Sequence, residues 1–355
     1  MEHRRLISHG IADRRFKSPA AAAAWLGGLQ AQDYNSVLWA IGLRCSGVDV
    51  EDVTRAFIEG ELVRTWLMRG TLQVAAAEDV RWMLQLLAPR LVFQSQRRLK
   101  QLEIDEPILS NSFDLLNRML EGRNLMTRPE IFAELERGGI SAIGQRGYHI
   151  LRQAAFRAHI CFGPRQDGIE TYAHLDEWIP RVSVKSREEC LAEMSARYFR
   201  SHGPATLQDF IWWSSLTTAD ARAGVDLTSS QMVRESIDGT TYWSYEESRS
   251  NGGFSARAYL LPAYDEYYLG YKSREVVLKA EHDADKVSSG GVFRPMLVID
   301  SQIAGVWKRM VKKKQVVVIL DPFAPLDQAD MESITAAAEA YASFLDLEID
   351  VRLDG

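Results

Sequence analysis

Two glutamines, Gln30 and Gln32, are the residues of this chain whose types and spacing best suit chemistry on a bound ligand. They flank Ala31, directly after an Ala-rich helix predicted over residues 18–26 ends at two glycines. On an extended backbone, residues i and i+2 project to the same side, so both amides can reach one water molecule or one ligand edge. An amide donates and accepts hydrogen bonds but does not titrate, so the pair can orient a water without strongly deprotonating it. The alternative is that both glutamines only satisfy backbone groups of a loop.

The neighbouring acid, Asp33, has two possible roles. It can hold a glutamine in place, or it can cap the helix that we expect to begin near Asn35. Because Asp is a preferred N-cap residue, the sequence favours capping.

The composition describes a globular chain with room for two or three domains. Of its 355 residues, 46% are hydrophobic and 25% charged, so a sizeable core can be buried. No apolar run is long enough to span a membrane, and the N-terminus lacks an apolar signal region, so we expect a cytoplasmic protein with no membrane partner. The scattered cysteines Cys45, Cys161 and Cys190 show no metal-ligand spacing and fit reduced thiols.

The charge is distributed unevenly along the chain. The overall net charge is −6, but residues 326–355 hold eight acids and a single base, so the remainder is close to neutral. Two stretches, 137–166 and 301–320, contain no acid and five basic residues each. Local basic stretches, rather than net charge, attract DNA phosphates, although solvated surface charge is the alternative explanation for each stretch.

Helices followed by a two-stranded ribbon recur along the chain and predict an α+β, mainly helical protein. The pattern of three helices and a ribbon over residues 18–75 is typical of a winged helix, and it recurs over 127–174 and 187–245. Strand-like runs and one helix follow from residue 259 onward. The predicted domains are a first winged helix at 1–77, a helical connector at 78–122, winged helices at 123–182 and 183–256, and a small β-rich α/β region at 257–355.

The second winged helix carries the arginines best placed for DNA. Its last helix, predicted over 148–158, would present Tyr148, Arg152 and Arg157 to the duplex. The loop 164–168 has turn-forming residues throughout and makes a wing with Arg165 near its tip. A wing arginine contacts the phosphate backbone rather than the bases.

Five short segments together resemble the winged-helix DNA glycosylases of the AlkZ/YcaQ group. The resemblance spans nearly the whole chain, and the segments occur in the family's order. They are Gln30-Ala31-Gln32-Asp33, Arg64 to Leu72, His202 to Thr206, Leu261 to Glu266 with Gly270 to Arg274, and Gly305 to Lys308.

This resemblance implies a C-shaped protein of three tandem winged helices that excises N-alkylated purines from double-stranded DNA. The family's catalytic motif of Gln, an apolar residue and Gln matches Gln30 and Gln32, whereas another branch has Asp at the second position. The AlkZ branch removes bulky N7-alkylguanine adducts, including interstrand crosslinks. One departure is Gln73, where relatives often carry His, so substrate preference can differ.

Neutral amides suffice for such a substrate because an N7-alkylated guanine is cationic and leaves as a neutral base. What remains is to position a water and to support an oxocarbenium-like sugar. The motif contains no lysine that could form a Schiff base, so we expect a monofunctional glycosylase. No phosphate-binding glycine loop is present, so neither a nucleotide nor another cofactor is expected.

Further basic residues are candidate DNA contacts. Arg64 and Arg69 bracket the first ribbon, where phosphate contact and surface ion pairing are both open; Lys272, Arg274 and Arg294 lie near the family segments. The expected core tryptophans are Trp39, Trp66, Trp82, Trp212 and Trp213. A monomer is expected, since three DNA-contacting modules do not require a dimer.

Two other functions remain open from the sequence. A winged-helix regulator or lesion sensor would bind DNA without chemistry. A protein–protein adaptor would show no salt-dependent DNA affinity.

Overall fold

The computed structural model describes every residue except 181–182, 247–256, 280–283 and 355. About half of the chain is helical, and the strands form several sheets, so the expected α+β class is confirmed. The end of the third predicted winged helix, at 247–256, lies outside the described residues.

The N-terminal part contains four helices and then a ribbon. The helices are α1 (Glu2–Ser8), α2 (Pro19–Leu26), α3 (Tyr34–Gly42) and α4 (Val50–Ile58). Side chains of Ser18, Asp33 and Asp49 cap the last three of these, each accepting a backbone N–H of the first turn. The ribbon consists of β2 (Leu62–Trp66) and β3 (Leu72–Ala76), joined through the 3₁₀ turn η1 (Met68–Gly70). The sequence did not predict α1.

A second helix-and-ribbon unit pairs directly with the first. Helices α7 (Arg128–Arg137) and α8 (Arg146–Phe156) precede β5 (Ile160–Phe162) and β6 (Thr171–His174), and the short helix α9 (Leu175–Trp178) follows. Strand β5 pairs with β2 at Arg64 and Phe162, and the short strands β1 (Leu29–Gln30) and β4 (Met126–Thr127) complete the sheet. The order β1-β3-β2-β5-β6-β4 therefore joins both ribbons in one six-stranded sheet.

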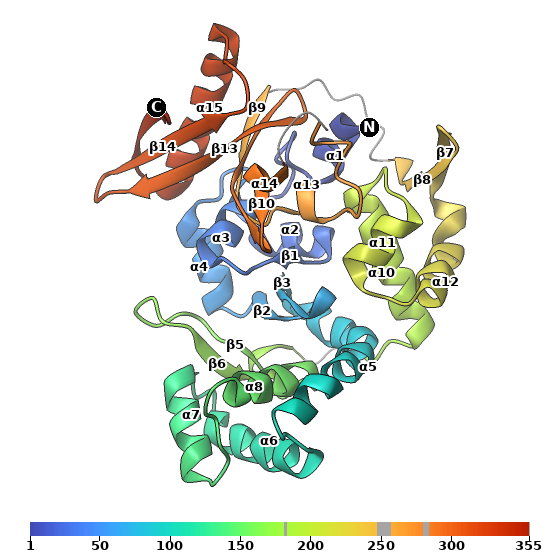
Figure 1. The fold of residues 1–355 in the computed structure, drawn as a ribbon, viewed down its shortest axis with the longest axis vertical. Helices are drawn as coiled ribbons and strands as arrows, with labels where there is room; N and C mark the ends of the chain where they lie inside the picture. The colour runs from blue at the N-terminus through green and yellow to red at the C-terminus, as the bar shows by residue number, and fades with distance from the viewer. Residues whose placement is uncertain (181–182, 247–256, 280–283, 355) are drawn as a thin grey trace.

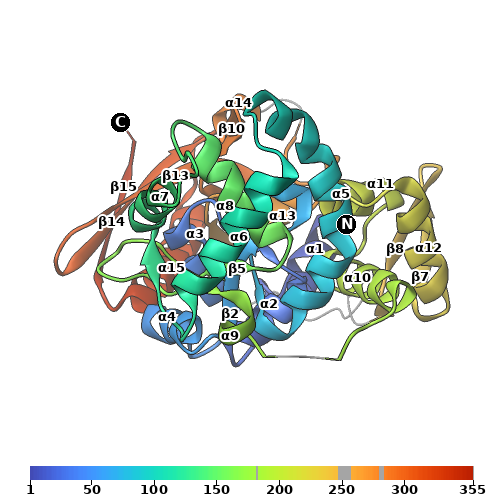
Figure 2. The same cartoon turned by 90° about the horizontal axis from the view of Figure 1, so that it is seen from below.

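Long helices connect these two units and lead to a third group. Helices α5 (Ala77–Gln101) and α6 (Glu106–Leu120) form the connector, and α8 contacts both (Figure 2). The third group contains α10 (Arg187–His202), α11 (Leu207–Ser214), α12 (Thr218–Thr228) and the short turn η2 (Ser229–Gln231). Its ribbon is formed by β7 (Val233–Ile237) and β8 (Thr240–Ser244).

The C-terminal region is a five-stranded sheet of order β15-β14-β13-β12-β9 with one long helix. The segment of chain between β9 and β12 forms two short helices and a hairpin. The helices are α13 (Glu266–Leu269) and α14 (Ala284–Val287), and the hairpin consists of β10 (Ser288–Ser289) and β11 (Val292–Phe293). Gly290 and Gly291 form the turn of this hairpin, and both have positive φ angles. The remaining elements are β9 (Ala258–Leu261), β12 (Met296–Ile299), β13 (Gln302–Val311), β14 (Gln315–Pro322), α15 (Gln328–Leu345) and β15 (Glu348–Leu353).

The two ends of the chain share one hydrophobic core. Trp39 on α3 contacts the rings of Tyr341 and Phe344 on α15, and its indole N–H donates to the carbonyl oxygen of Leu260 on β9. A second core joins β2 and β3 to α5, α8 and α10. In Figure 1, helices α2, α3 and α4 lie between the C-terminal sheet and the second unit. The segment that carries Gln30 is thus held from two sides.

The tryptophan expectation is confirmed at four positions and wrong at one. Trp39, Trp66, Trp82 and Trp213 are buried, but Trp212 is 41% exposed. Adjacent residues on a helix point about 100° apart, so α11 cannot bury both Trp212 and Trp213 against the same neighbour.

Candidate active site

Gln30 and Gln32 lie in contrasting environments although they are two residues apart. Gln30 ends β1 and pairs with Gln73 on β3, and it is only 9% exposed. The backbone N–H of Ala31 donates to the carbonyl oxygen of Leu72 at 2.8 Å, which continues the pairing. Gln32 follows this pairing and is exposed.

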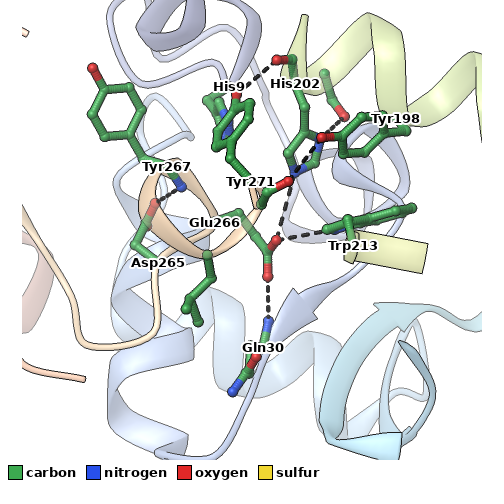
Figure 3. A network of polar contacts seen from close by, with 12 residues as sticks. His9, Gln30, Tyr198, His202, Trp213, Asp265, Glu266, Tyr267 and Tyr271 are labelled. Carbon is green, nitrogen blue, oxygen red and sulfur yellow. Dashed lines mark hydrogen bonds and ion pairs between the residues drawn. The ribbon is translucent and has the colours of Figure 1, made fainter. Parts of the chain in front are cut away.

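Fixed partners hold both glutamines. The Oε1 atom of Gln30 accepts a hydrogen bond from Nη2 of Arg69 at 2.8 Å, and its backbone N–H donates to Oε1 of Glu266 at 3.1 Å (Figure 3). The Oε1 atom of Gln32 accepts from the backbone N–H of Leu72 at 3.3 Å. Each amide oxygen has two acceptor sites, so each glutamine retains one of them together with its NH2 group.

Asp33 caps helix α3. Its Oδ1 accepts the backbone N–H of Ser36 at 2.6 Å, which confirms the favoured role.

Glu266 is the residue that sequence reasoning missed. It is the first residue of α13 and is only 1% exposed, yet its carboxylate lies beside the backbone of Gln30. Its Oε2 accepts from Nε1 of Trp213 at 3.1 Å, and Nε2 of His202 lies 3.6 Å away (Figure 3). The available signal was a carboxylate in the mostly apolar and aromatic segment 259–271, where a buried charge requires a purpose.

Buried histidines and tyrosines surround the far side of Glu266. The ring of His202 stacks on Tyr198 with centroids 4.7 Å apart, and Nε2 of His9 lies 2.9 Å from the hydroxyl oxygen of Tyr271. Burial lowers the pKa of both His9 and His202, so both rings are neutral near pH 7. Burial likewise raises the pKa of Tyr271 well above its usual range, so its hydroxyl remains protonated.

A buried ion pair anchors the segment that carries Glu266. Arg44 on the C-terminal side of α3 donates to both carboxylate oxygens of Asp265, each at 2.8 Å, and both side chains are fully buried. Asp265 also caps α13 by accepting the backbone N–H of Tyr267 at 2.9 Å. The start of α13 is therefore fixed relative to the N-terminal helices.

The predicted arginines of the first ribbon lie beside the glutamines and have protein partners. Arg64 is buried; its Nε donates to the carbonyl oxygen of Ala31 at 3.0 Å, and its guanidinium pairs with Glu170. Arg69 donates through Nη1 to the carbonyl oxygen of Trp213 at 3.0 Å, in addition to its bond to Gln30. Both side chains therefore shape the site from within.

The helix arginines of the second unit also have protein partners. Arg152 donates to the carbonyl oxygen of Gly70 at 3.0 Å, which places it beside η1. Arg157 forms a bidentate ion pair with Glu106, in which its two Nη atoms lie 2.6 and 2.8 Å from the two carboxylate oxygens. Surface ion pairs of this kind contribute little to stability, but they neutralise charge that DNA would otherwise meet.

The remaining predicted DNA contacts lie in different environments. The guanidinium of Arg165 lies 4.3 Å from the ring centroid of Tyr34 and 3.6 Å from a carboxylate oxygen of Glu170. Tyr34 is only two positions after Gln32 in the sequence. Arg274 packs among the rings of Trp212, Tyr268 and Phe293, whereas Lys272 and Arg294 are exposed. The structure thus brings Arg64, Arg69 and Arg165 close to the motif.

Gln73 lies opposite Gln30 and is fully buried. Its Nε2 donates to Oγ1 of Thr71 at 2.8 Å, and its Oε1 has no hydrogen-bond partner among the residues that the structure describes. This unpaired acceptor lies beside the motif, at the position where the sequence departs from the family pattern.

Within the described ranges, no group of three or more His, Cys, Asp or Glu side chains is arranged to hold a metal ion. The three cysteines are free and buried. No helix in these ranges has the length and apolar character needed to cross a membrane.

Comparisons with known proteins agree on one family. Residues 23–344 match the family described as DNA glycosylase AlkZ-like. A relative from Streptomyces sahachiroi, described as an interstrand DNA cross-link repair glycosylase, is 23% identical over 344 residues, covering 89% of this chain and 87% of its own. The solved structure of the DNA glycosylase AlkZ from Streptomyces sahachiroi superimposes with a TM-score of 0.78 at 21% identity, covering 99% of this chain and 98% of its own. The chain therefore belongs to the AlkZ-like family of DNA glycosylases.

Proposed function

We propose that this protein is a monofunctional DNA glycosylase that hydrolyses the N-glycosidic bond of cationic N-alkylated purines, above all N7-alkylguanine. Bulky adducts and interstrand crosslinks belong to the same substrate class, because each carries the cationic purine. The observation that carries the proposal is the pair of amides at Gln30 and Gln32, each held by a protein donor and each keeping hydrogen-bonding capacity for a water.

Catalysis by this pair relies on positioning. The cationic base departs neutral, so the reaction needs little proton transfer to the leaving group. Gln30 and Gln32 orient the attacking water below the anomeric carbon, and the lone pair that each carbonyl oxygen keeps free supports the positive charge that develops on the sugar. A neutral purine would require protonation as it leaves, and the motif offers no titrating acid for that step.

The helix-and-ribbon groups supply the surface for the duplex in this proposal. We assign the three groups, at 1–77, 123–182 and 183–256, as winged helices arranged in a C shape around DNA, with the chain acting as a monomer. Among the predicted contacts, Arg165, Lys272 and Arg294 are free enough of the interior to meet phosphates. Arg64 and Arg69 act inside the site instead.

The test measures release of 7-methylguanine from a defined duplex by mass spectrometry under single-turnover conditions. Gln30→Ala and Gln32→Ala should each slow excision by about 100-fold, the loss typical of a misplaced reacting group. DNA affinity should change little, since neither glutamine is proposed to carry phosphate contacts. Gln231→Ala, at an exposed glutamine distant in sequence, is the matched control.

Three results would decide against the proposal. Excision at the wild-type rate by both variants places the chemistry elsewhere. Salt-dependent DNA binding without release of any free base identifies a regulator or lesion sensor. A covalent complex trapped by borohydride contradicts the monofunctional mechanism.

A further inference from the structure

Gln30 belongs to a closed ring of four hydrogen bonds. Its backbone N–H donates to Oε1 of Glu266 at 3.1 Å, and its side-chain Oε1 accepts from Nη2 of Arg69 at 2.8 Å. Arg69 then donates through Nη1 to the carbonyl oxygen of Trp213 at 3.0 Å. The indole Nε1 of Trp213 donates to Oε2 of Glu266 at 3.1 Å and closes the ring.

The ring joins four elements that are far apart in the sequence. Gln30 comes from β1, Arg69 from η1, Trp213 from α11 and Glu266 from α13, and Gln30 and Glu266 are 236 positions apart. The pair of Arg44 and Asp265 also anchors α13 to the end of α3. The ring therefore fixes Gln30 relative to the whole fold.

Arg69 has an unusual backbone conformation that serves this geometry. Its φ angle is 57° and its ψ angle is 9°, in the left-handed region that is unfavourable for a residue other than glycine. This conformation, directly before Gly70, directs the guanidinium to Gln30 and the carbonyl oxygen of Trp213. Burial lowers the pKa of Arg69, and the nearby Glu266 carboxylate opposes that shift, so the two charges support one another.

The guanidinium determines which way the amide of Gln30 faces. Arginine only donates hydrogen bonds, so the atom of Gln30 next to it must be the carbonyl oxygen. The NH2 group of Gln30 then occupies the opposite edge of the amide. A charged donor on the carbonyl also polarises the amide, which makes its N–H groups stronger donors.

We propose that Glu266 and Arg69 are positioning residues for the reaction: through this ring they fix the orientation and polarity of the Gln30 amide that holds the water. This inference rests on the proposed function. Glu266 itself does not reach the substrate, because Gln30 and Trp213 cover both of its oxygen atoms.

Conservative variants break the ring while keeping side-chain size. In Glu266→Gln, the new NH2 group faces either the N–H of Gln30 or the indole N–H of Trp213, and both are donors. In Arg69→Lys the charge remains, but a single ammonium nitrogen cannot reproduce the fork that reaches Gln30 and Trp213 together. Each variant should lower the single-turnover excision rate at saturating enzyme at least tenfold and leave the Kd for 7-methylguanine duplex within twofold.

Arg197→Lys is the matched control. Arg197 also bridges separate elements, donating to the carbonyl oxygen of Ala24 and pairing with Asp79, but it is not part of the ring. Its variant should excise at the wild-type rate. Thermal unfolding of each variant identifies one that has failed to fold. If either Arg69→Lys or Glu266→Gln does not fold, the other variant still tests the ring.

A double-mutant cycle distinguishes positioning of Gln30 from a general structural role. If Glu266 and Arg69 act through Gln30, then Glu266→Gln and Arg69→Lys should slow a Gln30→Ala enzyme by less than twofold further. If the variants reduce the excision rate of the Gln30→Ala enzyme additively, the proposed positioning role is wrong. It is also wrong if both single variants excise at the wild-type rate. Wild-type excision by Gln30→Ala itself overturns the proposed function instead, so the two failures are separable.

Discussion

The interior around Gln30 and the surface of the second helix-and-ribbon unit use charged residues in opposite ways. Around Gln30, the charges of Arg44, Asp265 and Glu266 are buried and have fixed partners. In the second unit, Arg157 and Arg165 are partly exposed. Arg157 forms an ion pair with Glu106, and Arg165 packs on the ring of Tyr34. Charge interactions are strong where water is excluded and screened where it is present, so the first set fixes geometry and the second contributes less to it.

The same contrast separates two arginines of the predicted helix-and-ribbon pattern, one buried and one partly exposed. The ribbons of both units form one continuous sheet through β2 and β5. Arg64 lies on β2, between β3 and β5, and is buried; its Nε donates to the carbonyl oxygen of Ala31 in the glutamine motif. Arg165 lies on the loop between β5 and β6, and its side chain is only partly buried.

The largest expected effect is on stability, from Asp265→Asn. The variant leaves the Arg44 guanidinium buried without its counter-charge, which should lower the free energy of unfolding by about 3–5 kcal/mol. Urea denaturation measures the change. The control is Asp300→Asn, whose partner Arg257 is on the surface, so that the expected loss is much smaller. Equal losses in both variants would remove the distinction between interior and surface charge.

Stability should also fall in mildly acidic solution because of the buried histidines. Burial holds the folded-state pKa of His9 and His202 below the ordinary value of 6.5. Above that pH both folded and unfolded chains are neutral at these rings and the full stability is present. As the pH falls below about 6.5, the unfolded chain binds protons that the folded chain resists, costing about 1.4 kcal/mol per pH unit for each histidine.

Denaturation at pH 7.5, 6.0 and 5.0 checks this dependence, with His202→Gln as the diagnostic variant. The variant should show a shallower loss of stability toward pH 5. An unchanged slope would mean that other groups control the acid sensitivity.

A smaller effect is expected from the cap beside the motif. Asp33→Ala removes the acceptor for the backbone N–H of Ser36 and should cost about 1 kcal/mol of stability. Asp33→Asn retains a capping oxygen and should cost only a few tenths. Excision by both variants should stay within twofold of wild type; a large loss in the stable Asn variant would give Asp33 a part in the chemistry.

The smallest effects should come from single phosphate contacts at the surface. Arg165→Ala and Lys272→Ala should each weaken DNA binding a few-fold and reduce the slope of log affinity against log salt by about 1. Arg157→Ala should change the slope less, because Glu106 already neutralises that guanidinium. Fluorescence anisotropy across a salt series measures all three; a larger change for Arg157 would reverse the assignment of surface roles.

Local patterns in the sequence determined much of the fold. Asp33 marked a helix start correctly because capping depends on residues within one turn. Turn residues also located both ribbons of the first two units. The sequence did not show that these ribbons pair with each other, since strand pairing between distant segments depends on tertiary packing.

The residues of the site also fall into those that local sequence patterns predicted and those that only tertiary contacts revealed. Gln30 and Gln32 were visible from the sequence because their spacing along the chain is a local property. Glu266, Trp213 and the orientation of Arg69 were not, because their relation to Gln30 arises only when β1, η1, α11 and α13 meet in the folded chain. The sequence by itself determined which residue types are present for the chemistry and which helices begin beside them. Only the tertiary structure decided which charges are buried together, because burial depends on contacts between segments that lie more than 200 positions apart.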